Sequence, residues 1–380
     1  MAQHTCPDCR WLETRVEFDD GMNFACRRGH LPQGAPLLGR SPCKDFVLSE
    51  EVCPVGRVRG KAAPGAVRLT GPFLQAPDPD AFRAHNRDRK TLTPSPKIMD
   101  EHAAVKRFMK DGDYVGFELY GTVRCPLSIV REMIRQRKRR LRVLGQGLMD
   151  VDFLLAAGLV SALDLTYVGY EAYGLSPVLR RAVERDGVSV REWSNGALAW
   201  RLKAAAMGVP FLPARSMLGS DTLKSSGIQT MRDPYSGIQV ALLPALNPDC
   251  AVIHVHRADV NGNCQIDGIT GFAAELARAA KRVIVTAEEI VDPEVIRKTP
   301  ERTVIPFYEV DAVVHAPFGA HPGETCGLYK RDEEAIRDWL GAIADEAGTK
   351  AYLAKWVSGV PDHAGYRRRV GRDRLEGLRP

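Results

Sequence analysis

Three consecutive segments decide the fold: CAVIHV at residues 250–255, FAAELARAA at 272–280 and RVIVT at 282–286. The first and third are short, continuously apolar runs that are typical of buried strands. The middle one has apolar residues at helical spacing. A strand, a helix and a second strand in this order predict a β-α-β unit, in which both strands run parallel. Parallel strands are covered on both faces, which explains why these runs contain so few polar residues.

The same alternation extends outward from this unit in both directions. It predicts an α/β domain built on an open, mostly parallel sheet. Further strands are expected at 114–119, 141–144, 163–168, 188–192 and 310–315, and helices at 99–109, 126–137, 177–185 and 195–207.

The chain divides by composition into four parts. Residues 1–55 hold five of the nine cysteines and are predicted to form a small metal-stabilised module. Residues 56–96 are rich in Pro, Gly, Arg and Asp, which is typical of a linker. Residues 97–370 carry the α/β pattern, and the Arg-rich residues 371–380 are predicted to be a frayed tail.

Composition excludes several classes of protein. The 380 residues are 44% hydrophobic and carry a formal net charge of +6, which is ordinary for a soluble globular protein. We therefore expect no nucleic-acid partner, because such binding requires basic residues gathered on one face. No segment approaches the roughly 18 apolar residues of a membrane span, so we expect no membrane association and a cytoplasmic location.

The N-terminal cysteines have the spacing of a metal site. Cys6 and Cys9 form a CxxC pair, and Cys26 and Cys43 supply two more thiolates. In a reducing compartment such a cluster indicates metal ligands rather than disulfides. Four thiolates suit zinc or an iron-sulfur cluster, and a structural role is favoured because four ligands leave no open position for chemistry. Two further candidate ligands are His30 and Cys53.

Motifs in the second half of the chain resemble the A subunits of family I CoA-transferases, and glutaconate CoA-transferase in particular. They are GVPFLP at 208–213, RSMLGSD at 215–221, TAEEI at 286–290, VDAVVHAPFGAHP at 310–322 and GLY at 327–329. The resemblance implies an open α/β sheet, an acyl-CoA thioester as substrate, a carboxylic acid as acceptor and a partner B subunit. In the family, the glutamate that attacks the thioester belongs to that B subunit, so this chain is expected to be inactive alone.

A second branch of the same fold, the A subunits of ring-opening acyl-CoA hydrolases, is similar at residues 204–206, 210–213 and 218–220. In that branch the A subunit carries a glutamate at the position of Asn195. An amide cannot act as a general base, so Asn195 favours transfer over hydrolysis. A third alternative is a non-catalytic protein whose cysteines sense metal or redox state.

Several residues follow expected strands, where ligands bind in open α/β sheets. Each also has a structural interpretation: Glu171 as a loop glutamate, Arg215 and Ser216 as a surface turn, and Gly319 as a subunit contact. The paired histidines His254 and His256 are interpreted as structural. The predicted substrate-binding residues are Glu171, Asn195, Arg215, Ser216, Gly319 and His321.

Overall fold

The computed structural model describes residues 12–17, 21–26, 77–147, 149–170 and 173–380. The chain divides into two compact units, Met1–Arg68 and Leu69–Pro380. In the first unit, β1 (Leu12–Glu17) and β2 (Gly21–Cys26) form an antiparallel hairpin in which Leu12 lies opposite Cys26. The second unit carries the remaining described elements.

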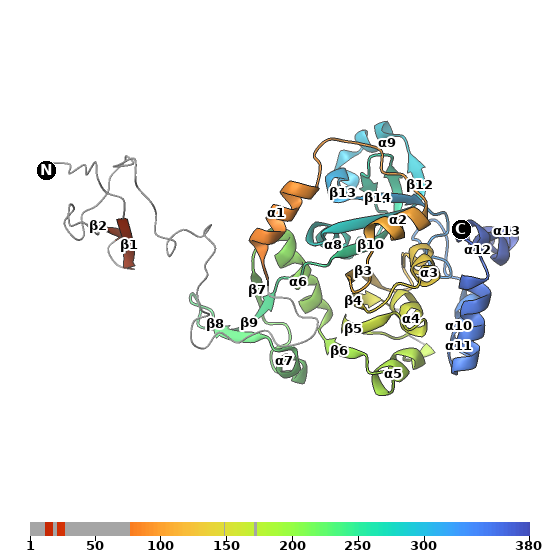
Figure 1. Ribbon diagram of the computed structural model, residues 1–380, viewed down its shortest axis with the longest axis horizontal. Helices are drawn as coiled ribbons and strands as arrows, with labels where there is room; N and C mark the ends of the chain where they lie inside the picture. Colours follow the sequence, from red (N-terminus) through yellow and green to blue (C-terminus); the bar gives the residue numbers. More distant parts are fainter. Residues whose placement is uncertain (1–11, 18–20, 27–76, 148, 171–172) are drawn as a thin grey trace. The chain divides into compact units, whose positions relative to one another are not determined.

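A sheet of nine strands, counted over the described residues, forms the centre of the second unit (Figure 1). Parallel pairing runs through it in the order β14-β12-β10-β3-β4-β5-β6, and β11 and β13 add antiparallel pairing beside the second half of β10. Its strands are β3 (Tyr114–Gly121), β4 (Leu141–Gly147), β5 (Val160–Leu165), β6 (Ser189–Glu192), β10 (Cys250–Asp259), β11 (Cys264–Gln265), β12 (Arg282–Val291), β13 (Thr303–Ile305) and β14 (Ala312–His315).

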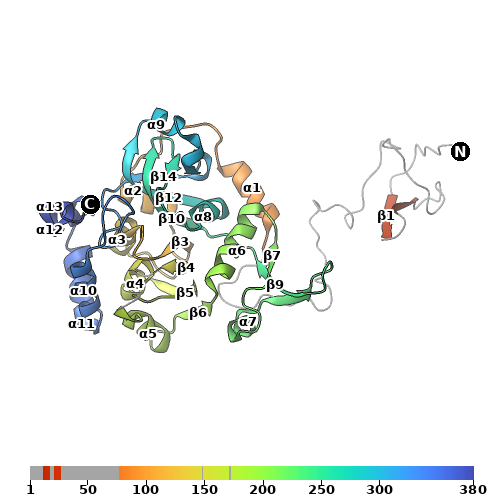
Figure 2. The ribbon, with the colours of Figure 1, turned by 180° about the vertical axis from the view of Figure 1, so that it is seen from behind.

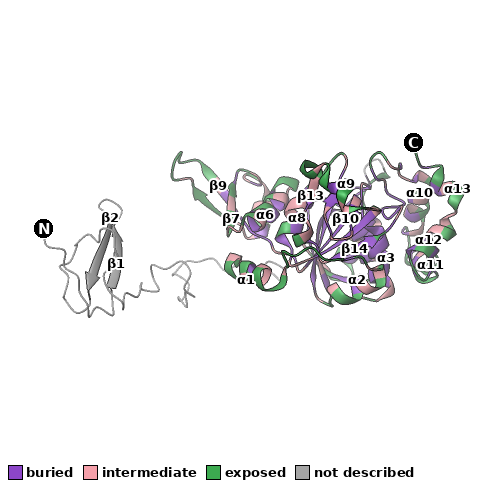
Figure 3. Cartoon of the chain, turned by 90° about the horizontal axis from the view of Figure 1, so that it is seen from above, coloured by how far each residue is buried: buried purple, intermediate pink, exposed green. Residues whose placement is uncertain are grey.

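A smaller three-stranded antiparallel sheet projects from the body of this unit (Figures 1 and 3). It consists of β7 (Phe211–Ala214), β8 (Gln229–Arg232) and β9 (Gln239–Pro244). The strand β7 contains most of the PFLP motif, and it follows closely on the long helix that precedes it.

Helices cover both faces of the main sheet, and Figures 1 and 2 both show α10 and α11 beside α4. The helices are α1 (Pro79–Arg89), α2 (Glu101–Phe108), α3 (Leu127–Arg135), α4 (Met149–Ala156), α5 (Pro177–Glu184), α6 (Asn195–Met207), α7 (Asp221–Ser226), α8 (Ala273–Ala279), α9 (Pro293–Arg297), α10 (Glu333–Ala342), α11 (Glu346–Leu353), α12 (His363–Val370) and α13 (Arg372–Glu376). None of the described helices is long and apolar enough to cross a membrane.

Two hydrophobic cores lie on opposite faces of the sheet (Figure 3). Alternate residues of one strand belong to different cores: Val115 packs with α2, α3, α4 and α10, whereas Tyr114 packs with α6 and α8. Side chains of a strand alternate between the two faces of the sheet. A strand of a sheet that helices cover on both faces therefore needs apolar residues at successive positions. The predicted open, mostly parallel α/β sheet is therefore what the structure contains.

Local signals explain where α6 begins and ends. The Ser194 hydroxyl accepts a hydrogen bond from the backbone N–H of Ala197 at 3.1 Å, and Gly208 ends the helix with a φ of +72°. A serine N-cap and a left-handed glycine after the last turn are the usual terminal signals of a helix. The helix Asn195–Met207 has the bounds that the sequence predicted.

Two segments that the sequence predicts to lack regular structure contain helices. The expected linker at 56–96 contains α1, which is capped by Asp78, begins with Pro79 and buries Phe82. A single buried aromatic residue leaves little periodicity for a sequence pattern to show. The expected frayed tail at 371–380 contains α13, and Leu375 and Leu378 are buried. Two leucines spaced three apart anchor this Arg-rich segment.

A buried aspartate ties several elements of the fold together. The carboxylate of Asp164, on β5, accepts hydrogen bonds from the Trp193 indole at 2.8 Å, from Arg201 at 3.3 Å and from the Tyr114 hydroxyl. Asp164 and Arg201 are both fully buried. These contacts hold β3, β5 and the start of α6 in one arrangement.

Replacing Asp164 with alanine should destabilise the second unit, because it leaves the Arg201 guanidinium buried without its anionic partner. Loss of one member of a buried ion pair costs about 3–5 kcal/mol. Chemical unfolding of Asp164→Ala against the parent chain measures this change. Asp221→Ala is the control, because Asp221 pairs with Lys224 on the surface with its side chain 95% exposed, and the unfolding midpoint should not change. Equal effects of the two substitutions would contradict the proposed role of Asp164.

Candidate functional site

The strand order reverses between the neighbouring strands β3 and β10. From this pair, the chain adds β4, β5 and β6 on one side and β12 and β14 on the other. In open α/β sheets, ligands bind outside the carboxyl ends of the strands at such a switch point. The segments that leave the strands at this edge are therefore the place to look for a site.

Arg124, in the loop after β3, occupies the switch point. Its guanidinium pairs with Glu118 at 2.6 Å and donates hydrogen bonds to the backbone oxygens of His254 at 2.7 Å and Ile269 at 3.1 Å. Arg124 is 1% exposed and has a φ of +51°, a backbone conformation that costs energy for a residue other than glycine. The pKa of Glu118 is raised to about 7 because burial outweighs the attraction of Arg124.

Two more buried groups lie nearby on α4 and the β3 loop. Burial raises the pKa of Asp150 to about 7; one of its oxygens accepts from the Val151 N–H at 2.7 Å, and the other has no hydrogen-bond partner among the described residues. Burial also raises the pKa of the Cys125 thiol well above its usual range. A protonated, buried thiol is a poor nucleophile, so Cys125 is unsuited to covalent catalysis.

A hydrogen-bond network surrounds Glu288 on β12. Its carboxylate accepts from His254 at 2.8 Å, from the Tyr329 hydroxyl at 2.5 Å, and from the backbone N–H groups of Phe318 at 2.7 Å and Gly319 at 3.2 Å. His254 also contacts the Thr286 hydroxyl at 2.7 Å. Burial acts to raise the pKa of Glu288, but the His254 hydrogen bond and the other donors outweigh it, so the pKa lies below its usual range.

The structure brings some of the sequence-predicted residues together. The hydroxyls of Ser194 and Ser216 are 2.5 Å apart, and Gln146, at the end of β4, donates to the backbone oxygen of Asn195 at 3.2 Å. Asn195 and Ser216 therefore share one corner of the edge, at the N-terminus of α6. Arg215 is exposed beside them.

The other predicted residues lie elsewhere. Gly319 belongs to the Glu288 network, where an added side chain would meet the Ala316 backbone oxygen at 2.6 Å. His321 is 1% exposed and contacts the Tyr366 hydroxyl at 2.7 Å and Asp332 at 3.1 Å, so it connects this loop to the C-terminal helices. Glu171 lies outside the described residues.

Sequence reasoning missed Glu118, Arg124, Asp150 and Glu288. The signal that could have found the first two is a charged residue within and just after an otherwise apolar strand, since a buried charge requires a partner. Glu118 and Asp150 are buried, and the Glu288 side chain is 6% exposed, with a carboxylate that accepts hydrogen bonds from four donors. None of these three is presented to attack a substrate from this chain.

Comparison with known proteins agrees with this geometry. The coenzyme A transferase family model matches residues 98–316. The chain belongs to this family. The crystal structure of glutaconate coenzyme A-transferase from Acidaminococcus fermentans superposes with a TM-score of 0.72 and 30% sequence identity, covering 75% of this chain and 96% of the other. The resemblance drawn from the sequence motifs is thereby confirmed.

Two further relatives match over most of their length. The A subunit of the 3-oxoadipate CoA-transferase from Pseudomonas knackmussii is 34% identical over 72% of this chain and 98% of its own length. An uncharacterized protein of Archaeoglobus fulgidus is 50% identical over 95% of this chain and 87% of its own. The latter match is long enough to extend into the N-terminal cysteine-rich segment.

Glu288→Gln should destabilise the protein in a pH-dependent way. A carboxylate with a lowered pKa stabilises the fold above the unfolded-state value of 4.5, and this contribution is lost as the pH falls through the lower folded-state pKa. The loss should be about 2 kcal/mol or more near neutral pH, since hydrogen bonds to charged groups contribute about 1.5–3 kcal/mol each.

Unfolding of parent and variant between neutral and strongly acidic pH measures this difference. It should be constant at neutral pH and shrink below about pH 4.5, where Glu288 is protonated first in the unfolded chain and then, at lower pH, in the folded protein. Glu289→Gln, at the exposed neighbouring position on β12, is the matched control and should have little effect at any pH. A Glu288→Gln effect that does not depend on pH would show that ionisation of Glu288 is unimportant.

Proposed function

We propose that this chain is the A subunit of an acyl-CoA:carboxylate CoA-transferase whose nucleophilic glutamate is supplied by a partner B subunit. The observation that carries the proposal is the family membership together with the state of three acids at the switch-point edge: Glu118 and Asp150 are buried, and Glu288 accepts four hydrogen bonds. This edge presents fixed hydrogen-bond donors, and none of these three acids is available as a nucleophile. Such an edge fits an active site to which a second subunit adds the nucleophilic glutamate.

The chemistry requires a carboxylate nucleophile. The partner's glutamate attacks the thioester carbonyl, the C–S bond breaks and CoA leaves as the thiolate, which gives an acyl anhydride. The thiolate then attacks the glutamyl carbonyl, which forms a glutamyl-CoA thioester and releases the first carboxylic acid. The second acid reverses both steps and takes up CoA. This chain would orient the acyl group and stabilise developing negative charge.

The predicted substrate-binding residues fit this role at the N-terminus of α6. Ser216, held against Ser194, lies at a helix N-terminus, where backbone N–H groups and the helix dipole favour anions. Arg215 is exposed and suits a substrate carboxylate or a CoA phosphate, because its guanidinium can donate two parallel hydrogen bonds. Gly319 and His321, both buried, are proposed to shape the site, and Glu171 to line the acyl pocket.

The transfer proposal predicts that product depends on an acceptor acid. The chain should be co-expressed with a B-type partner chain, and the complex incubated with a panel of acyl-CoA thioesters with and without carboxylic acids. New acyl-CoA should appear when an acceptor is present, and free CoA should not accumulate in its absence; chromatography of CoA species measures both. The chain alone is the control and should be inactive.

Accumulation of free CoA without an acceptor would favour the alternative, an acyl-CoA hydrolase of the ring-opening type, and would show that Asn195 does not prevent hydrolysis. Absence of acyl-CoA binding and turnover in the complex would favour the third alternative, a non-catalytic metal- or redox-sensing protein.

We further propose that the N-terminal unit is a structural metal module with Cys6, Cys9, Cys26 and Cys43 as ligands. The CxxC spacing of Cys6 and Cys9 supports this proposal, and Cys26 is the last residue of β2, opposite Leu12. Cys6, Cys9 and Cys43 lie outside the described residues.

Four thiolates would bind zinc or an iron-sulfur cluster, and either would stabilise a segment too short to build its own core. His30 and Cys53 are further candidates for a ligand position and also lie outside the described residues.

The metal proposal predicts about one tetrathiolate site per chain. Elemental analysis and the visible absorption spectrum of anaerobically purified protein distinguish zinc from an iron-sulfur cluster. Serine at Cys6, Cys9, Cys26 or Cys43 should each abolish metal binding, whereas Cys326→Ser, at an exposed position of the second unit, should not. Serine at Cys53 and alanine at His30 test the two other candidates. Protein that carries no metal, or keeps it in all four variants, would refute the module.

A further inference from the structure

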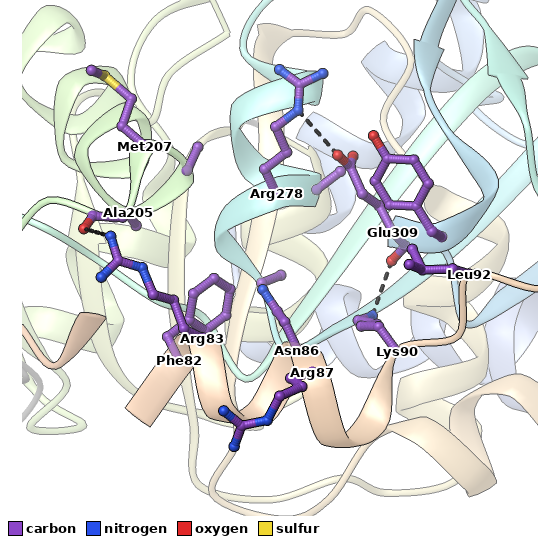
Figure 4. A pocket seen from close by; sticks show the side chains of 15 residues that line it. Phe82, Arg83, Asn86, Arg87, Lys90, Leu92, Ala205, Met207, Arg278 and Glu309 are labelled. Carbon is purple, nitrogen blue, oxygen red and sulfur yellow. Dashed lines mark hydrogen bonds and ion pairs between the residues drawn. The ribbon is translucent and has the colours of Figure 1, made fainter. Parts of the chain in front are cut away.

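A cavity of about 600 Å³ lies between α1, the end of α6 and α8, as Figure 4 shows. This volume is within the range of small-molecule pockets, about 300–1,000 Å³. The helix α1 precedes residues 98–316, which match the family model, so one wall comes from outside the matched family segment. Because α6 begins at the switch-point edge, its far end places this cavity on the opposite edge of the sheet.

Two polar atoms of this cavity's lining residues have no hydrogen-bond partner among the described residues. Glu309 is 8% exposed; its Oε1 accepts from Arg278 at 3.0 Å, whereas its Oε2 is buried and unpartnered. The Oδ1 of Asn86, on α1, is likewise buried and unpartnered. Burial raises the pKa of Glu309 to about 7 despite the neighbouring Arg278 and Lys90. Buried polar atoms are normally satisfied. A ligand that draws these two side chains toward the cavity would give both atoms a hydrogen-bond donor.

The rest of the lining indicates the ligand's other properties. Its apolar walls include Phe82, Ala205, Ala277 and Tyr308, which leave flat surfaces suited to a planar ring. Arg83 and Arg87 add cationic side chains from α1; both are exposed, and they pair with Asp80 at 3.2 Å and Asp88 at 3.0 Å. Arg83 reaches the backbone oxygen of Gly208 at 3.1 Å, at the end of α6, so it connects the two helices that frame the opening.

We propose that this cavity is a binding site for a purine nucleoside phosphate. A purine ring fits between the alanine and aromatic walls, and its N–H donors would satisfy Glu309 and Asn86 after a small rotation of these side chains. The phosphate would lie at the exposed rim and pair with Arg83, taking the place of Asp80 as its anionic partner. The same chemistry is carried by free nucleotides and by the adenosine 3′,5′-bisphosphate portion of CoA, so the source must be found by experiment. The site is separate from the proposed catalytic edge and does not depend on that function.

Calorimetry on the full-length chain with AMP, 3′,5′-ADP and inorganic phosphate tests the proposal. At least one nucleotide should bind about tenfold or more tightly than phosphate, since loss of a good hydrogen bond in a desolvated site costs about 1–3 kcal/mol. Preference for AMP would indicate free nucleotides, and preference for 3′,5′-ADP would indicate CoA. Phosphate binding as tightly as both nucleotides, or binding of no nucleotide, overturns the proposal.

Variants locate the binding. Asn86→Leu and Glu309→Gln should each weaken nucleotide binding by about tenfold. Asn86→Leu should not lower the thermal midpoint, because it removes an unpartnered acceptor. Arg89→Ala is the matched control, since Arg89 is an exposed arginine of α1 outside the cavity lining, and should leave affinity unchanged. If a variant misfolds, Arg83→Ala replaces it, because Arg83 is an exposed residue at the rim of the cavity. Affinity that none of these cavity substitutions changes would place the nucleotide elsewhere and refute the site.

Discussion

The ion pair between Arg124 and Glu118 is the contact on which the switch-point edge depends. The two charged groups are 2.6 Å apart and almost fully buried, and they lie at the switch point between β3 and β10. The same guanidinium also binds the backbone of β10 through His254 and the loop at Ile269. A buried charge is tolerated when an opposite charge balances it, as Glu118 does for Arg124, and each of these contacts comes from a different segment. One side chain thus fixes the loop after β3 relative to β10.

Further buried acids fix the rest of this edge in the same way. Asp164 anchors Trp193 and thereby the start of α6, where the Ser194 hydroxyl contacts that of Ser216 next to Asn195. Asp152 accepts from the Tyr170 hydroxyl at 2.5 Å and so orients the segment that leads toward Glu171. Neutralised or fully hydrogen-bonded carboxyls of this kind rigidify the loops that carry them. The edge is therefore a preorganised surface, which is what charge stabilisation during acyl transfer requires.

The amino-acid sequence was sufficient to predict the strands and helices of the fold, but it was not sufficient to predict which polar side chains meet. The strand at 250–255 and the helix at 195–207 were predictable because their signals are local: continuous apolar residues in one, a serine cap and a terminal glycine in the other. The pairing of His254 with Glu288 was not, because 34 residues separate them and the strand register decides which side chains meet. The structural interpretation of His254 is consistent with its position in that network. The helix α1 was missed because Phe82 alone carries its apolar face.

The helix α6 relates the two edges of the sheet. Its first residue, Asn195, lies at the switch-point edge, and Gly208, just past its last residue, lines the cavity. Thirteen helical residues span about 20 Å, so a ligand in the cavity would reach the switch-point edge only by moving α6 as a rigid body. Arg201, near its middle, is bound to Asp164 and stacks over Trp193 at 3.9 Å. A shift of α6 along its axis would break the buried contacts of Arg201 with Asp164 and Trp193. These contacts therefore hold α6 in place and oppose any transmission of a change from the cavity to the switch-point edge. Independent occupation of the two sites is therefore the expected behaviour of this fold.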